Sequence, residues 1–183
     1  MTAPAPLELL TEAVSLVSSS IDAASTADST SRTPCTDWDL ATLVRHVADS
    51  AATVRQIIEG SPPGLPPPAG CAAAQRELHR LLRTIQEAPR NSPVVDLVAL
   101  TGAYEFSVHA CDVDQATGSV VGIPAHLVAP LLACAPLVLD HIERSGLFGR
   151  AIPASETRTD TGRLLALFGR RLSSDSTSSK GPV

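Results

Sequence analysis

The stretch DLATLVRHVADSAATVRQIIE, residues 39–59, decides the fold predicted for this chain. Its apolar residues recur at steps of three and four, which is the period of an amphipathic α-helix. They are Leu40, Leu43, Val44, Val47, Ala51, Val54 and Ile58. Asp37 or Asp39 can accept a hydrogen bond from the first exposed amides and so cap the helix. We therefore expect a helix over residues 39–59 with one face in a core.

The same periodicity predicts further helices on both sides of this stretch. Their expected ranges are 6–24, 71–87, 94–117, 124–145 and 161–171. Residues 60–70 contain five prolines and cannot be helical, because proline lacks an amide donor and fixes φ. Pro130 and Pro136 should kink or split the helix that contains them, and Gly118 suits a helix end. No segment alternates with the period of a strand, so we expect an all-α bundle.

Length and composition fit one globular domain over residues 1–172, followed by a disordered Ser-rich tail over residues 173–183. The four cysteines contain no C-x-x-C pair and are expected to be free thiols. With a net charge of −5 and no basic stripe, nucleic-acid binding is not expected. No apolar run approaches about 20 residues and no leader pattern follows Met1, so we expect a cytoplasmic protein without a membrane partner.

The helix over residues 94–117 contains the most informative polar pair. Glu105 and His109 are four residues apart and therefore lie on one helix face. A carboxylate turned into a bundle is costly unless something neutralises it, and a metal ion would satisfy both groups. A surface ion pair explains the same spacing, and it remains an open alternative.

Two ligands do not make a stable site, so a third must come from another helix. His46, in the middle of the 39–59 helix, is the best candidate, although it could also be a hydrogen-bonded core histidine. His79, His126 and His141 compete with it. Two histidines and one carboxylate suit zinc, and they suit iron, nickel or manganese as well.

Residues 33–46, Thr-Pro-Cys-Thr-Asp-Trp-Asp-Leu-Ala-Thr-Leu-Val-Arg-His, resemble the TPC-x-x-WD-x-x-x-L-x-x-H signature of the mycothiol-dependent maleylpyruvate isomerase N-terminal family. Residues 105–118 resemble the second signature of that family, E-x-x-VHGWDLARATG, and residues 163–170 resemble its closing RLLAFLGR segment. The resemblance extends over about residues 5–171. It implies a DinB-like four-helix bundle with a short C-terminal helix.

The resemblance also implies a metal site. The ligand positions of the family fall on His46, Glu105 and His109, which would bind a divalent metal, commonly zinc. Asp112, one turn beyond His109, is assigned as the catalytic residue, in the role of an acceptor that holds a ligand imidazole in place; a solvated carboxylate is the open alternative. The family further implies that the metal activates a low-molecular-weight thiol of the mycothiol type.

Three hypotheses about function follow. The first is a metal-dependent thiol transferase or isomerase that acts on a small electrophilic metabolite. The second is a thiol-independent, metal-dependent cyclase or lyase of specialised metabolism. It is suggested by two departures from the family signature: Ala110-Cys111 replaces Gly-Trp, and residues 113–115 replace Leu-Ala-Arg. These replacements would change the rim of the pocket. The third is a non-catalytic metal-binding bundle. The oligomeric state is open, with a homodimer as one option.

Overall fold

A computed structural model describes residues 4–35, 37–139 and 150–172 of the 183-residue chain. The chain divides into two compact units, Met1–Val120 and Val121–Val183, which are taken separately below. All regular structure in the described residues is helical, so the all-α fold class is confirmed. The single domain over residues 1–172 stays a prediction, and the tail over residues 173–183 lies outside the described residues.

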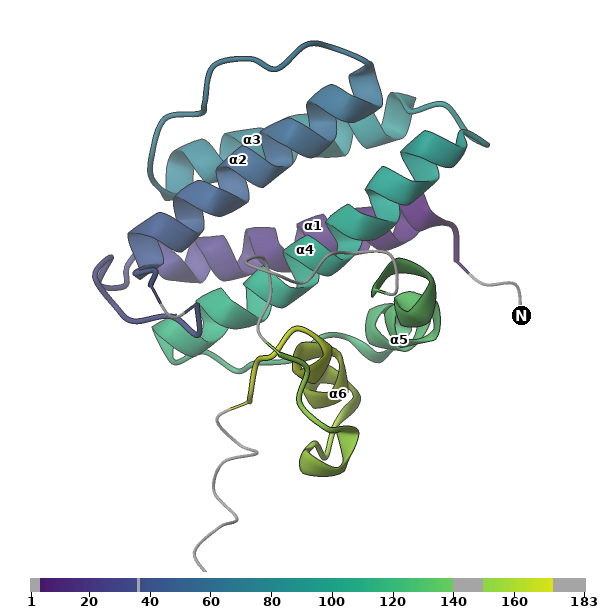
Figure 1. Cartoon of the computed structure of the whole chain (residues 1–183). Coiled ribbons are helices and arrows are strands. Elements are labelled where there is room, and N and C mark those ends of the chain that lie inside the picture. Colours follow the sequence, from purple (N-terminus) through teal and green to yellow (C-terminus); the bar gives the residue numbers. More distant parts are fainter. Residues whose placement is uncertain (1–3, 36, 140–149, 173–183) are drawn as a thin grey trace, which may run out of the picture. The chain divides into compact units, whose positions relative to one another are not determined.

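The first unit contains four long helices. They are α1 (Pro6–Ala24), α2 (Leu40–Glu59), α3 (Cys71–Glu87) and α4 (Pro93–Thr117). Each lies within one residue of its predicted bounds at both ends. Figure 1 shows them as the purple, blue and teal ribbons.

Short-range chemistry explains where these helices begin and end. Asp39, rather than Asp37, caps α2, because its carboxylate accepts the Thr42 amide at 2.8 Å. Ser92 caps α4 in the same way, and Pro93 occupies the first helical position, where no amide donor is needed. Gly118 ends α4 with φ at 71°, in the left-handed region that glycine adopts without strain.

The four helices pack around a shared core. Both α1 and α2 contact α3 and α4, so that each helix lies between two neighbours. Large fully buried side chains come from every helix: Leu10, Val14, Ile21, Leu40, Leu43, Leu78, Leu81 and Phe106. Gly102 lets α4 approach α1 closely, because a Cβ there would lie 2.9 Å from Leu10 Cδ1. The four-helix bundle is therefore held together by close packing of aliphatic residues.

Helix α4 is the most buried helix of the first unit. By length and composition it could also cross a membrane, but 61% of its most apolar window is buried in the structure. A core helix of a soluble protein passes the same test, so this is weak evidence for a membrane span. The burial matters for function because polar residues on α4 must find partners inside the protein.

The second unit contains α5 (Ala125–Leu139), a 3₁₀ turn (Ala154–Glu156) and α6 (Asp160–Leu167). Helix α5 continues through both of its prolines, so it is not split over the described residues, and the alternative of a kink stays a prediction. Residues 140–145 of the predicted helix lie outside the described residues.

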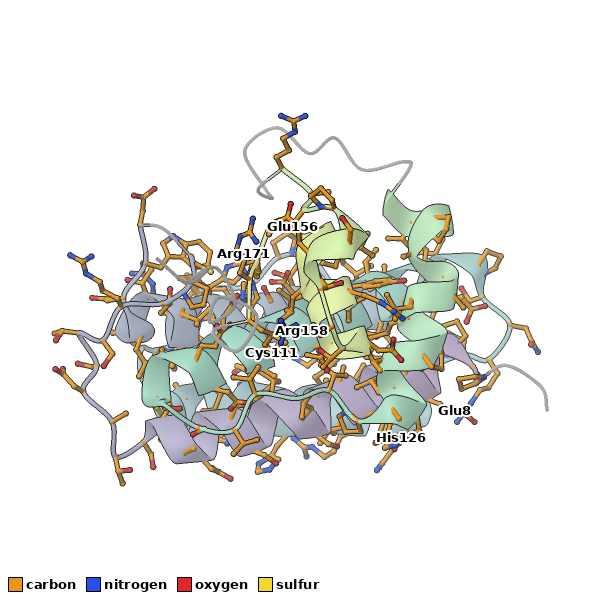
Figure 2. The ribbon with its side chains drawn as sticks, turned by 90° about the horizontal axis from the view of Figure 1, so that it is seen from below. Glu8, Cys111, His126, Glu156, Arg158 and Arg171 are labelled. Carbon is orange, nitrogen blue, oxygen red and sulfur yellow. The ribbon has the colours of Figure 1, made fainter. Side chains whose placement is uncertain are left out.

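Helix α6 ends four residues earlier than predicted. Gly169 adopts a φ of 75°, and the amides of residues 169 and 170 bond back to carbonyls of the last helical turn. Beyond this end, Arg171 pairs with Glu156 at 2.7 Å. Figure 2 labels both side chains.

Candidate metal centre

Three of the predicted site residues meet between α2 and α4. His46 lies in the middle of α2, and Glu105 and His109 lie one turn apart on α4. The Nε2 atom of His46 is 2.6 Å from Oε1 of Glu105, and the Nε2 atom of His109 is 3.4 Å from the same oxygen. The three candidate ligand atoms all lie within 4.8 Å of one another.

The three side chains differ in their access to solvent. The side chain of His46 is 34% exposed and that of Glu105 is 24% exposed, whereas that of His109 is 6% exposed. The cluster therefore opens to solvent on the His46 side. Its inner side is closed by the body of α4.

Charge at this cluster follows from burial and from the close contacts. Burial raises the pKa of Glu105, but hydrogen bonds from His109 and His46 outweigh this effect and hold the pKa well below its usual value. Burial lowers the pKa of His109, but hydrogen bonds with Asp112, Cys35 and Glu105 raise it well above its usual value. The cluster therefore favours a carboxylate at Glu105 and positive charge beside it.

Asp112 lies behind His109, away from Glu105. Its carboxylate oxygen Oδ2 is 2.9 Å from Nδ1 of His109, and its side chain has no exposed surface. When Nδ1 carries the proton and donates it to Asp112, the lone pair of the imidazole is on Nε2, which faces Glu105. The expected position of Asp112 next to a candidate ligand imidazole is thus found.

Three neighbours of the cluster were not assigned to the site from the sequence. Ser50, one turn after His46 on α2, donates its hydroxyl to Glu105 Oε1 at 2.8 Å. The ring centroid of Trp38 lies 4.7 Å from that of His46 and 6.2 Å from that of His109. Cys35 donates its thiol to Oδ2 of Asp112 at 3.4 Å. The i, i+4 spacing of His46 and Ser50 was a usable signal, and Cys35 and Trp38 stand in the signature of residues 33–46.

A hollow opens beside the Trp38 side chain. It has a volume of about 680 Å³ and is lined by Thr30, Arg32, Thr33, Pro34, Asp37, Trp38, Asp39 and Thr42. Trp38 is therefore shared between this hollow and the two histidines. The lining is mostly hydroxyls and charged groups, which suits a polar ligand.

His79, the competing histidine that the structure describes in the first unit, does not join the cluster. His79 is exposed on α3, and His126 is exposed on α5 in the second unit. His141 lies outside the described residues. On α2, the Ser50 hydroxyl lies 3.4 Å from Nε2 of His46.

Cys111 does not lie where a pocket rim was expected. It has no exposed surface on α4, where Figure 2 labels it. Burial raises the pKa of its thiol, and the nearby carboxylates of Asp114 and Asp112 add to the increase. The thiol is therefore protonated and enclosed. Because Cys111 is enclosed in the core, its side chain does not itself form part of a pocket rim.

Two sets of metal-ligand side chains occur among the described residues. The first is His46, Glu105 and His109, and the second is Cys35, His109 and Asp112. The first set has the composition of catalytic zinc sites, with nitrogen and oxygen donors. Two donors each about 2.05 Å from zinc at a tetrahedral angle are roughly 3.3 Å apart. The His109–Glu105 separation matches this value, and the 2.6 Å His46–Glu105 separation has to widen.

Comparison with known proteins tests the resemblance. Residues 10–88 match the family model described as the mycothiol maleylpyruvate isomerase N-terminal domain. The match includes His46 and ends before Glu105, His109 and Asp112. No curated protein and no solved structure matches the chain.

The match confirms the resemblance seen in residues 33–46. The resemblances of residues 105–118 and 163–170 lie outside it and stay predictions. The matched family is metal-binding and has a DinB-like helical fold, in agreement with the four-helix bundle described above. Residues 10–88 of this chain therefore match the mycothiol maleylpyruvate isomerase N-terminal domain, a DinB-like helical domain of a metal-binding family.

Proposed function

We propose that this protein is a metal-dependent enzyme that holds one divalent ion through His46, Glu105 and His109. The observation that carries the proposal is the convergence of these three side chains, from two helices, within 4.8 Å. The Glu105 carboxylate between two imidazole nitrogens offers the oxygen and nitrogen donors that a divalent cation binds. Zinc is the first choice of metal, and nickel, iron and manganese accept the same donors.

The surrounding residues prepare the ligands. Asp112 accepts a hydrogen bond from the Nδ1–H of His109, which leaves the lone pair of Nε2 for the metal. Ser50 donates to Glu105 and holds Oε1 between the two imidazoles. Trp38 lies against the His46 ring and limits its rotation. In this proposal Asp112 acts by positioning, because its side chain has no exposed surface and does not reach a substrate.

Three protein ligands leave coordination positions open, which is the arrangement of catalytic metal sites. A metal bound there lowers the pKa of a thiol or water and polarises a carbonyl group. We therefore propose a thiol S-transferase or isomerase that uses a low-molecular-weight thiol of the mycothiol type on a small electrophilic metabolite. The family match of residues 10–88 supports this choice.

A thiol-independent cyclase or lyase is the second candidate. This candidate was suggested by an altered pocket rim at Ala110-Cys111. The burial of Cys111 weakens that support. Gln115, in place of the family arginine, is half-buried and remains a real difference in the second signature. Loss of this positive charge would weaken binding of an anionic cosubstrate.

The decisive experiment combines metal removal with a thiol panel. The full chain is treated with chelator, reloaded with Zn²⁺ or left without metal, and mixed with an electrophile and several small thiols. Metal-dependent thiol consumption supports the first candidate, and metal-dependent turnover without thiol supports the second. Stoichiometric metal binding without turnover would show a non-catalytic bundle, and absence of metal binding would overturn all three.

A further inference from the structure

The loop that precedes α2 carries a cysteine that the proposed function leaves without a role. Sγ of Cys35 lies 3.4 Å from Oδ2 of Asp112, and the same oxygen lies 2.9 Å from Nδ1 of His109. A thiol donates weakly to a carboxylate, and an imidazole N–H donates strongly. Cys35, Asp112 and His109 therefore form a continuous chain of contacts from the loop to a proposed ligand.

We infer that Cys35 is a positioning residue for His109, acting through Asp112 and through its own contact with the imidazole. The inference rests on the proposed function, because it requires His109 to bind the metal. In this inference, residues of the loop before α2 orient a metal ligand that lies on α4.

Local hydrogen bonds fix the backbone from which Cys35 projects. Its amide donates to the Thr33 hydroxyl at 3.1 Å, and its carbonyl accepts the Trp38 amide at 2.9 Å. The Thr33 hydroxyl also donates to the Trp38 carbonyl at 2.8 Å. These bonds join Cys35 and Trp38 into one turn. The turn places the thiol against Asp112 and the indole beside the His109 ring.

The burial of Asp112 explains why a second donor matters. Its side chain has no exposed surface, so solvent cannot compensate for a donor that is lost. Both donors converge on Oδ2, and the thiol therefore holds that oxygen on the side that faces His109. Loss of the thiol removes one of the donors that fix Oδ2, and the imidazole loses part of its orientation.

Direct coordination by Cys35 is the competing explanation. Its Sγ, with donors from His109 and Asp112, forms the second set of candidate ligands within 4.8 Å. That set would use Nδ1 of His109, the nitrogen held by Asp112. The Nε2 atom instead faces Glu105 at 3.4 Å, on the side of His46. This arrangement favours metal binding at Nε2, with Cys35 behind the ligand.

The test uses the metal-free full chain and Co²⁺ as the probe. Affinity is measured by competition with a chromophoric chelator for the unchanged chain, Cys35→Ala, Cys35→Val and Cys35→Ser. We expect Cys35→Ala and Cys35→Val, which lack a donor, to bind Co²⁺ about three- to tenfold more weakly. Cys35→Ser keeps a donor and should bind nearly as tightly as the unchanged chain. Cys71→Ala, at a half-buried cysteine at the start of α3, is the matched control and should change nothing.

The visible spectrum of the bound Co²⁺ gives a second readout. We expect a shifted ligand-field band in Cys35→Ala that returns in Cys35→Ser, and no thiolate charge-transfer band in any chain. Unchanged affinity in Cys35→Ala or Cys35→Val overturns the inference. A charge-transfer band that disappears in Cys35→Ser also overturns it, because Cys35 would then be a ligand. If the unchanged chain fails to bind Co²⁺, the proposed function fails first, and the inference fails with it.

Discussion

Replacing His46 by alanine should separate metal binding from stability. The His46 and Glu105 side chains are 34% and 24% exposed, and their ion pair joins two atoms 2.6 Å apart. Because partly exposed pairs contribute about 0.2–1 kcal/mol, the free energy of unfolding should fall by no more than about 1 kcal/mol. Metal affinity should fall by about tenfold or more, which corresponds to at least about 1.4 kcal/mol of binding free energy.

Replacing His109 by alanine should have both effects at once. The imidazole is 6% exposed and lies between Glu105 and Asp112, whose side chain has no exposed surface. Removing one partner of a buried pair costs about 3–5 kcal/mol, because the other charge stays buried. We therefore expect the metal-free His109→Ala protein to lose about 3 kcal/mol, several times the loss in His46→Ala.

The assay measures the two quantities separately. Urea unfolding of the metal-free proteins, followed by far-ultraviolet circular dichroism, gives the free energy of unfolding, and calorimetric titration with Zn²⁺ gives the affinity. The exposed His79 on α3 provides the control, and His79→Ala should change neither quantity. Zn²⁺ affinity unchanged in His46→Ala would refute the ligand assignment. Equal destabilisation of the two ligand variants would refute the argument from exposure.

Three further predictions concern the rest of the bundle. Gly102→Ala should lower the free energy of unfolding, measured by urea denaturation, by about 1 kcal/mol. The new Cβ would lie 2.9 Å from Cδ1 of the buried Leu10, and this close contact should outweigh the gain in helix propensity. Increased stability would contradict this prediction. Cys111→Ser should keep full Zn²⁺ binding while losing about 1–3 kcal/mol of stability, since a hydroxyl replaces an enclosed thiol; weakened Zn²⁺ binding would show that Cys111 belongs to the site. Burial raises the pKa of Asp114, and the Ser20 hydroxyl only partly offsets this, so the ionised carboxylate disfavours folding. Asp114→Asn should therefore be more stable than the unchanged chain at pH 7. The difference should shrink as the pH falls through the raised folded-state pKa toward the ordinary value, and a gap that widens in acid unfolding curves would be the opposite result.

Local sequence predicted the helices of the first unit closely. Apolar residues at three- and four-residue steps marked the buried faces, and the bounds of α1, α2, α3 and α4 lie within one residue of expectation. These features depend on interactions between near neighbours, such as the Asp39 cap and the left-handed Gly118. At the end of α6 the prediction was four residues too long, because the local helix-ending role of Gly169 was overlooked.

The candidate site was predicted in part. The pairing of Glu105 with His109 followed from their spacing on one helix, and the choice of His46 needed the resemblance of residues 33–46. His46 and Glu105 are 59 positions apart, so no local rule brings them together. Ser50, Trp38 and Cys35 were not assigned to the site because each acts through packing of distant segments.

The sequence by itself determined which segments are helical, which face of each helix is apolar and which residues could bind a metal. It could do so because hydrogen bonding, capping and periodicity act over a few residues. Only the tertiary structure decided that the loop before α2 reaches Asp112, that Trp38 lies beside both imidazoles and that Cys111 is enclosed in the core. Those outcomes depend on how α2 packs against α4 and on where the loop before α2 lies. Contacts between residues far apart in sequence control both the packing and the position of the loop.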